Sequence, residues 1–331
     1  MRVWIQNPFD NLPEEGYRRQ RYRLMADAFL RAGHEVTYFT SDFSHSSKAP
    51  RRFAVAADSP PTVLVPTPAY RRNVSLRRVW SHLAYARNWL KLAAAKPPPA
   101  LIVASMPTIS GAEAALKLGR RFGARVVVDV QDAWPETFER LLPRWLLAPL
   151  RRRAQAVYRA ADFVTGVCDR YRELVGRDDY YRAYLGIDAP PAAVARSGDR
   201  RYVYAGALGR SYRLEEWVRR VEADERLSLD VAANGRLRVA CPRVRQHGYL
   251  DAAALSALLA ACDVGVIPMR DDSWVGVPNK FFDYAAAGLR IETSLGGECA
   301  ALAERWNRGQ LPWSELDART IYDAYVRKVT T

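Results

Sequence analysis

The sequence PNKFFD combines a helix start with one cation and one carboxylate. Pro278 and Asn279 stand where a helix is predicted to begin, after an apolar strand predicted over residues 264–269. The first N–H groups of a helix have no hydrogen-bond partner within the helix, and they lie at the positive end of its dipole. They can therefore donate to an anion. Lys280 adds a full positive charge, and the Asp283 carboxylate suits sugar hydroxyls. The segment predicts a phosphate and ribose site; the alternative is an ordinary strand, loop and helix.

A glycine-rich segment, YAGALGR, follows the strand predicted over residues 201–205. Gly206 and Gly209 let a ligand approach the backbone closely, and the planar guanidinium of Arg210 can hold a phosphate. Two glycines at this spacing, followed by an arginine, are weak evidence for a phosphate site when taken alone. Together with PNKFFD, it predicts the second wall of a single diphosphate pocket.

These motifs resemble the donor-nucleotide signature of family 4 glycosyltransferases, which have the two-domain GT-B fold. The resemblance rests on CDVGVIPM, PNKFFDYAAAG, YAGALG and DVQDAWPE, and it extends over nearly the whole chain. It implies that Asp283 holds the ribose and that the helix start at Asn279 and Lys280 holds the pyrophosphate. The first glutamate of the family's paired-glutamate motif would fall at Val275, and Asp271 or Asp272 is a candidate substitute.

Further site residues follow from the same resemblance. Family 4 loops of the first domain contact the donor phosphate and the acceptor, which makes Gly16, Tyr17, Arg18 and His45 candidates. For His45, an ordinary surface-loop histidine is an equal alternative. Tyr249 stands where the family makes its nucleobase contacts.

Asp132 follows the apolar strand predicted over residues 125–130, at an end where parallel sheets admit ligands. The segment DVQDAWPE resembles the family pattern that faces the reacting sugar. Asp132 is therefore the catalytic candidate, to orient the acceptor hydroxyl, accept its proton or stabilise positive charge on the anomeric carbon. The alternative is that Asp132 or Asp129 only caps the following helix.

Charge is distributed unevenly along the 331 residues. Residues 1–165 hold 26 Lys and Arg against 13 Asp and Glu, whereas residues 166–331 hold 24 against 23. The basic first half predicts an anionic partner, such as acidic lipid headgroups, a lipid-linked diphosphate or a glycan. Nucleic acid is the rival partner, but the sequence offers no nucleic-acid motif.

Residues 74–96 predict an amphipathic helix with basic residues on its other positions. Its apolar stripe is Leu76, Val79, Trp80, Leu83, Ala86 and Leu90. The stripe favours a helix that faces the core, whereas the charge favours one in a membrane interface. Residues 46–73, with five prolines, are predicted to be irregular. The four cysteines are far apart, and neither a disulfide framework nor a zinc site is expected.

Strands that alternate with helices predict an α/β fold of two Rossmann-like domains facing across a cleft. We expect an acceptor domain at residues 1–195, a donor domain at 196–312 and a terminal helix at 313–331 that crosses back to the first domain. The N-terminal apolar run is too short for a signal peptide, and no stretch approaches the length of a membrane span, which predicts a cytoplasmic protein. The basic first domain predicts peripheral contact with the inner membrane face.

The predicted function is transfer of a sugar from a nucleoside diphosphate sugar to an acceptor hydroxyl, in glycan, glycolipid or glycosylated-metabolite synthesis. The resemblance implies retention of configuration, and neither metal nor cofactor is expected. A nucleotide-sugar epimerase of the same fold and a non-catalytic nucleotide-sugar or glycan binder are the alternatives. The non-catalytic alternative stays open because Val275 stands where the family has a glutamate.

Overall fold

The computed structural model describes residues 1–15, 17, 19–51, 60–139, 141–191, 198, 200–209, 212–271 and 273–331. The chain divides into two compact units. The first unit comprises Met1–Tyr184 with Arg319–Thr331, and the second comprises Leu185–Ala318. The domain boundary predicted at residue 195 lies in segment 192–197, outside the described residues.

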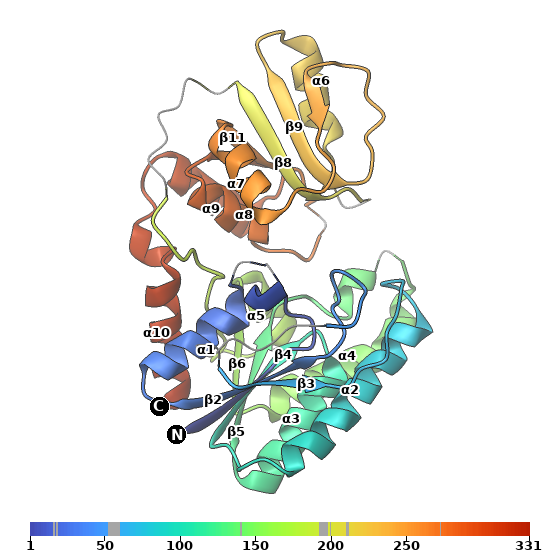
Figure 1. The fold of residues 1–331 in the computed structure, drawn as a ribbon, viewed down its shortest axis with the longest axis vertical. Coiled ribbons are helices and arrows are strands. Elements are labelled where there is room, and N and C mark those ends of the chain that lie inside the picture. Colours follow the sequence, from blue (N-terminus) through green and yellow to red (C-terminus); the bar gives the residue numbers. More distant parts are fainter. Residues whose placement is uncertain are drawn as a thin grey trace. The chain divides into compact units, whose positions relative to one another are not determined.

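The first unit is built on a parallel sheet whose strand order reverses between β1 and β4 (Figure 1). Among the described residues, this sheet has seven strands in the order β3-β2-β1-β4-β5-β6-β7. They are β1 (Arg2–Gln6), β2 (Glu35–Ser41), β3 (Thr62–Val65), β4 (Leu101–Met106), β5 (Arg125–Val130), β6 (Phe163–Gly166) and β7 (Tyr181–Arg182).

Helices cover both faces of this sheet. In Figure 1, α1 and α10 lie together on one side and α2 and α3 on the other, and α4 packs against α3. The helices are α1 (Arg21–Arg31), α2 (Leu76–Ala94), α3 (Ile109–Phe122), α4 (Arg144–Ala160), α5 (Arg170–Val175) and α10 (Ala318–Thr330), with short 3₁₀ turns at Pro13–Glu15 and Glu136–Phe138.

Aromatic side chains fill the core of the first unit between β1, β2 and the helices α2 and α3. The Trp4 ring meets Phe39 edge-on at 5.3 Å and Phe122 at 5.7 Å, measured between ring centroids. Phe39 in turn lies 5.8 Å from Trp89 of α2. Edge-to-face pairs of this kind add to the free energy gained by burying the rings.

The second unit has a smaller parallel sheet, with five strands in the order β10-β9-β8-β11-β12 among the described residues. Its strands are β8 (Arg201–Ala207), β9 (Ser228–Asn234), β10 (Val244–Gln246), β11 (Val264–Ile267) and β12 (Arg290–Thr293). Its helices are α6 (Glu215–Ala223), α7 (Ala252–Ala260), α8 (Asn279–Ala286) and α9 (Gly297–Asn307), followed by a 3₁₀ turn at Trp313–Glu315.

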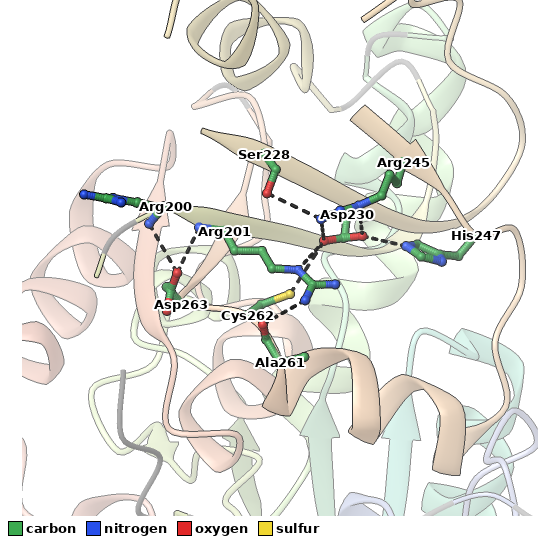
Figure 2. Close-up of polar contacts among 9 residues, drawn as sticks. All are labelled: Arg200, Arg201, Ser228, Asp230, Arg245, His247, Ala261, Cys262 and Asp263. Atoms are coloured by element: carbon green, nitrogen blue, oxygen red, sulfur yellow. Dashed lines mark hydrogen bonds and ion pairs between the residues drawn. The ribbon is translucent and has the colours of Figure 1, made fainter. Parts of the chain in front are cut away.

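A buried carboxylate ties three strands of the second unit together (Figure 2). Asp230 of β9 accepts hydrogen bonds from Arg201 of β8 at 2.7 Å and from Arg245 of β10 at 2.9 and 3.0 Å. The ring of His247 lies 2.7 Å from the same carboxylate. Burial alone would raise the pKa of Asp230, but these partners hold it at about 2.

Two expectations about secondary structure were wrong in part. Residues 46–73 are not irregular throughout, because Thr62–Val65 forms β3 at the edge of the first sheet. Its flanking prolines, Pro61 and Pro66, limit the strand to four residues and suit an edge position. The C-terminal segment predicted as one helix contains a 3₁₀ turn before α10 begins at Ala318.

The interpretation of the α2 stripe as a core-facing surface was wrong for its first two turns, although Ala86 of the stripe is buried. Leu76, Trp80 and Leu83 are 88%, 56% and 47% exposed. The core face of α2 instead presents His82, Tyr85 and other residues, namely Ser81, Ala86, Trp89 and Ala93. The aromatic residues of this second face fill the core, which leaves the aliphatic stripe at the surface.

A fully buried ion pair joins α1 to β5 in the first unit. Arg21 donates two parallel hydrogen bonds to Asp129, at 2.7 and 2.8 Å, and neither side chain is exposed. Asp129 also accepts from the hydroxyls of Tyr22 and Thr165, at 2.9 and 2.6 Å. Burial favours the neutral acid, but the charge and hydrogen bonds of Arg21 lower the pKa of Asp129.

Arg21 also contacts the two segments that end the first unit, the residues after β7 and the helix α10. Its guanidinium donates to the backbone carbonyl of Ala183 at 2.6 Å and lies 3.4 Å from the Tyr322 hydroxyl of α10. One side chain therefore binds a strand, the segment after β7 and the C-terminal helix. Asp129, weighed above as a helix cap, is the structural partner of Arg21.

Replacing Arg21 with Gln should destabilise the protein by about 3–5 kcal/mol, because it leaves the Asp129 charge buried without its partner. Urea denaturation measures this loss. Arg153→Gln is the matched control, since its ion pair with Glu113 is 2.6 Å long but lies at the surface. That variant should lose less than about 1 kcal/mol. Equal losses for the two variants would contradict the role given to Arg21.

Candidate functional site

The strands β8 and β11 of the second unit separate where the strand order reverses. They pair only at Val264 with Tyr202 and at Gly265 with Val203 among the described residues. Beyond that point, the Tyr284 hydroxyl of α8 accepts from the Ala205 N–H at 3.0 Å and donates to the Val266 carbonyl at 3.2 Å. Open α/β sheets bind ligands at this place, outside the carboxyl ends of the two diverging strands.

Lys280 lies at this opening, on the first turn of α8. Its ammonium group is 5.3 Å from the ring centre of Tyr204 and 4.9 Å from that of Tyr212. Burial lowers the pKa of Lys280, and the Asp283 carboxylate opposes that effect. A cation held by ring faces stays available to an anionic ligand.

Gly206 makes room for this lysine at the end of β8. Its φ of +140° is one that other residues rarely adopt. A Cβ atom placed there would lie 2.5 Å from Nζ and 2.7 Å from Cε of Lys280. The backbone conformation therefore favours glycine, and a Cβ atom here would push the flexible end of Lys280 aside.

The two loops beside this opening are bound to each other. Tyr212 forms an isolated bridge with Met269, and the Arg213 N–H donates to the Pro268 carbonyl at 2.6 Å. Asn279 is exposed at the start of α8, after Pro278 in extended conformation. The structure thus brings together Gly206, Lys280 and the start of α8, as the sequence predicted, and Gly209 lies in the first loop.

Other predicted donor residues lie apart from this group or outside the described residues. Arg210, Gly16 and Arg18 belong to the residues that are not described, as does Asp272. Tyr249 follows β10 at the sheet edge and is 69% exposed. The Asp271 carboxylate accepts from the Gly296 N–H at 2.6 Å, and Val275 is half-buried.

A second group of polar and aromatic residues lies at the carboxyl edge of the first sheet. We call it the cation–aromatic cluster. Its members come from the loops after β1, β2, β3 and β5 and from the first turns of α2: Phe9, His45, Lys48, Tyr70, Arg78, His82 and Trp134. His45 is the one member that the sequence predicted, whereas Tyr17 lies before α1 and is half-buried.

The two histidines of this cluster are neutral. Nδ1 of His45 contacts the Tyr70 hydroxyl and lies 3.3 Å from the Lys48 ammonium. Nε2 of His82 accepts a hydrogen bond from Arg78 at 3.3 Å. Burial and the nearby cations lower the pKa of His45 to about 4 and that of His82 to about 3.

Asp132 stands beside this cluster, two residues after β5. Its carboxylate accepts from the Thr137 hydroxyl at 3.2 Å. Burial raises the pKa of Asp132, while that hydrogen bond, the Ala133 N–H and the charge of Arg78 lower it. A carboxylate with a raised pKa at a strand end has the properties of a general base.

The family of the chain is decided by comparison with known proteins. Residues 18–194, more than half of the chain, match the glycosyl transferase 4-like domain family. The chain belongs to this family. It is a glycosyltransferase that transfers sugars on a GT-B fold, with two parallel α/β sheets as predicted. No curated protein sequence matches the chain significantly.

Solved structures confirm the fold of this glycosyltransferase. Sucrose-phosphate synthase from Thermosynechococcus elongatus matches with a TM-score of 0.65 at 13% identity, over 99% of this chain and 94% of that one. The catalytic domain of starch synthase IV from Arabidopsis thaliana, bound to ADP and acarbose, gives 0.61 at 11% identity, over 99% and 97%. A putative UDP-N-acetylglucosamine 2-epimerase from Listeria monocytogenes gives 0.54 at 12%, over 100% and 88%.

No helix among the described residues is long and apolar enough to cross a membrane. Within the same residues, no group of three or more His, Cys, Asp and Glu side chains is arranged to hold a metal ion.

Most residues of the cation–aromatic cluster were not predicted from the sequence as site residues. Arg78 and His82 are four residues apart on one helix, a spacing that places them on one face and could have drawn attention to them. Tyr70 and Lys48 carried no such signal, because they come from two separate loops. Only the fold brings these loops together.

Gly206→Ala should destabilise the glycosyltransferase by about 1–3 kcal/mol, because the new Cβ displaces Lys280 and the backbone is strained. Adding Lys280→Ala should recover part of this loss, since the displaced group is then absent. Urea denaturation of the two single variants and the double variant measures the coupling. Gly309→Ala is the control, because its φ is +68° and nothing lies within 4 Å of the new Cβ. Strictly additive losses would show that Gly206 and Lys280 do not interact.

Proposed function

We propose that this glycosyltransferase moves a sugar from a nucleoside diphosphate sugar to a hydroxyl of an acceptor held by the first unit. The donor diphosphate binds at the carboxyl ends of β8 and β11. The observation that carries this proposal is the Lys280 ammonium, held over two tyrosine rings at the start of α8. Asp283, one turn further on, supplies a carboxylate for the ribose hydroxyls.

The chemistry requires stabilisation of a leaving group. When the bond between the anomeric carbon and the diphosphate oxygen breaks, negative charge develops on that oxygen. Lys280 and the N–H groups of α8 then stabilise it, with Arg210 as a further predicted cation. The electrostatic role that a metal has in other enzymes is assigned here to side chains and a helix.

Asp132 is the residue we assign to the acceptor. Its carboxylate orients the acceptor hydroxyl and accepts its proton as the new bond to the anomeric carbon forms. The raised pKa of Asp132 supports this role. The family resemblance implies retention of configuration at that carbon.

A nucleotide-sugar epimerase and a non-catalytic nucleotide-sugar binder are the competing proposals. The epimerase shares the fold, as the Listeria monocytogenes structure illustrates. The binder is favoured by Val275, which stands where the family has a glutamate. Membership of the glycosyl transferase 4-like family favours the transferase over both.

A thermal-shift screen with UDP, GDP, ADP, CMP and dTDP, with and without magnesium, tests the donor site. One nucleoside diphosphate should raise the melting temperature in the absence of metal, since selective binding stabilises the folded state. Lys280→Ala should abolish that shift, whereas Arg219→Ala, which removes an exposed cation of α6, should keep it. If no nucleotide stabilises the wild-type protein, the donor-site proposal fails.

We further propose that the first unit docks on a membrane that contains anionic lipids. Nine large apolar side chains among the described residues of α2, α4 and the segments before them are exposed: Val74, Leu76, Val79, Trp80, Leu83, Leu141, Leu142, Trp145 and Leu146. We call them the apolar surface. Between its two parts in sequence, the Trp134 ring lies 5.1 Å from Arg78 of α2 and 4.8 Å from Phe138, which precedes Leu141 and Leu142.

Charge around the apolar surface supports a lipid partner. Exposed arginines flank both parts, namely Arg71, Arg72, Arg77, Arg144 and Arg152. Tryptophans beside arginines are typical of segments that lie in the interface of an anionic bilayer. The apolar side chains would enter the headgroup region while the arginines meet the lipid phosphates.

Vesicle co-sedimentation tests this docking. The wild-type protein should bind phosphatidylglycerol vesicles more strongly than phosphatidylcholine vesicles, and added salt should weaken binding. Trp80→Ser with Trp145→Ser should reduce binding about tenfold or more, since two rings lose their contact with lipid. Leu30→Ser, at a residue of α1 that is 38% exposed, is the control. Equal binding by the double variant and the wild type would refute docking through this surface.

A further inference from the structure

Two cations of the cation–aromatic cluster, Lys48 and Arg78, lie against the same tyrosine ring. The Lys48 ammonium lies 4.8 Å and the Arg78 guanidinium 5.8 Å from the centre of the Tyr70 ring. Both also donate to Asn73, Lys48 to the side-chain oxygen at 2.6 Å and Arg78 to the backbone carbonyl at 2.8 Å. Each like charge disfavours the other, so this arrangement costs free energy unless a third group compensates.

The compensating charge is missing from the described part of the chain. Both cations are half-buried, yet no Asp or Glu oxygen of the described residues lies within 4.0 Å of either. Their hydrogen-bond partners are neutral, and His45 and His82 are held in the neutral form. Two half-buried cations side by side, with only neutral hydrogen-bond partners, give the cluster the charge of an anion site.

Aromatic rings limit what can reach these cations. The Arg78 guanidinium lies 5.4 Å from the centre of the Phe9 ring and 5.1 Å from that of the Trp134 ring, so two aromatic rings lie beside it. Phe9 in turn contacts His45 and His82, with ring centres 5.2 and 5.1 Å away. Phe9 and Trp134 are partly exposed, so aromatic surface beside the cations is in contact with solvent and can pack against the apolar face of a sugar.

The position of the cluster relates it to the proposed reaction. Arg78 is close enough to Asp132 for its charge to lower the pKa of that carboxyl, without an ion pair between them. An acceptor bound at Arg78 would therefore have other atoms beside Asp132. The cations and the proposed base belong to the same unit and the same edge of the sheet.

We propose that Arg78 and Lys48 bind an oxyanion of the acceptor, a phosphate or a carboxylate, and so hold its hydroxyl toward Asp132. This inference rests on the proposed transferase function and adds the chemical class of the acceptor: a sugar that carries an acidic group. Arg78 and Lys48 are binding residues in this scheme and take no part in proton transfer.

Ligand-observed NMR at 0.15 M salt tests the site with glucose 1-phosphate and glucuronate, and with glucose as the neutral comparison. The wild-type protein should bind at least one acidic sugar and bind it more tightly than glucose. Arg78→Gln should weaken that binding about tenfold or more, because a charged hydrogen bond is lost. Arg87→Gln, at an exposed position on the same helix, removes the same charge and should change binding less than about twofold.

A second variant and a competition experiment complete the test of the anion site. Lys48→Gln should also weaken binding of the acidic sugar, which covers the case in which Arg78→Gln fails to fold. Inorganic phosphate should displace glucose 1-phosphate if the oxyanion is the group held, and failure to displace it would overturn the assignment. Acidic sugars that bind no better than glucose, or equal losses in Arg78→Gln and Arg87→Gln, would overturn the site.

The nucleotide screen separates this inference from the proposed function. If a nucleoside diphosphate binds but acidic sugars do not, the anion site is refuted and the donor site stands. If acidic sugars bind in an Arg78-dependent way but no nucleotide does, the anion site is supported and the transferase proposal needs revision. The two measurements depend on different units, so each can fail without the other.

Discussion

The buried pair of Arg21 and Asp129 is the constraint on which the first unit depends. Two charges without exposure are stable only when every hydrogen-bonding position is used, and here the partners come from α1, β5, β6, the segment after β7 and α10. The pair therefore fixes the end of β5. Asp132 follows three residues later, so the same motif contains one carboxylate that organises the fold and another that remains available for chemistry.

In the second unit, the side chain of Tyr284 pairs polar groups that would otherwise be buried without a partner. The diverging strands β8 and β11 would leave backbone groups unpaired, and the Tyr284 hydroxyl satisfies one group on each strand. Tyr284 and Lys280 are four residues apart on α8, so one helix both holds the sheet open and places a cation at the opening. Gly265 and Gly206 give the two side chains their space, since a Cβ at either position would lie within 2.5 Å of one of them.

Sequence alone predicted the sheet strands well where they are buried and apolar. The bounds of β5 agree with the prediction, and those of β8 and β11 differ from it by two residues at one end, because such runs are typical of parallel strands covered on both faces. The place of Lys280 was also predictable, since a helix start after a strand is local information. The buried face of α2 was not, because its core residues include Ser81 and His82 while Leu76 and Leu83 are exposed. The cation–aromatic cluster joins loops that are distant in sequence, and no local pattern contains that contact.

The division of the chain has a consequence for its synthesis. The second unit is one continuous segment and can fold as soon as Ala318 has left the ribosome. The first unit is discontinuous: Tyr322 and Tyr325 of α10 are fully buried in it, although its other residues are made first. Until those tyrosines emerge, α1 lacks its packing partner and Arg21 one of its contacts. Within residues 1–331, the first unit can therefore complete its core only after the whole of the second unit has been made.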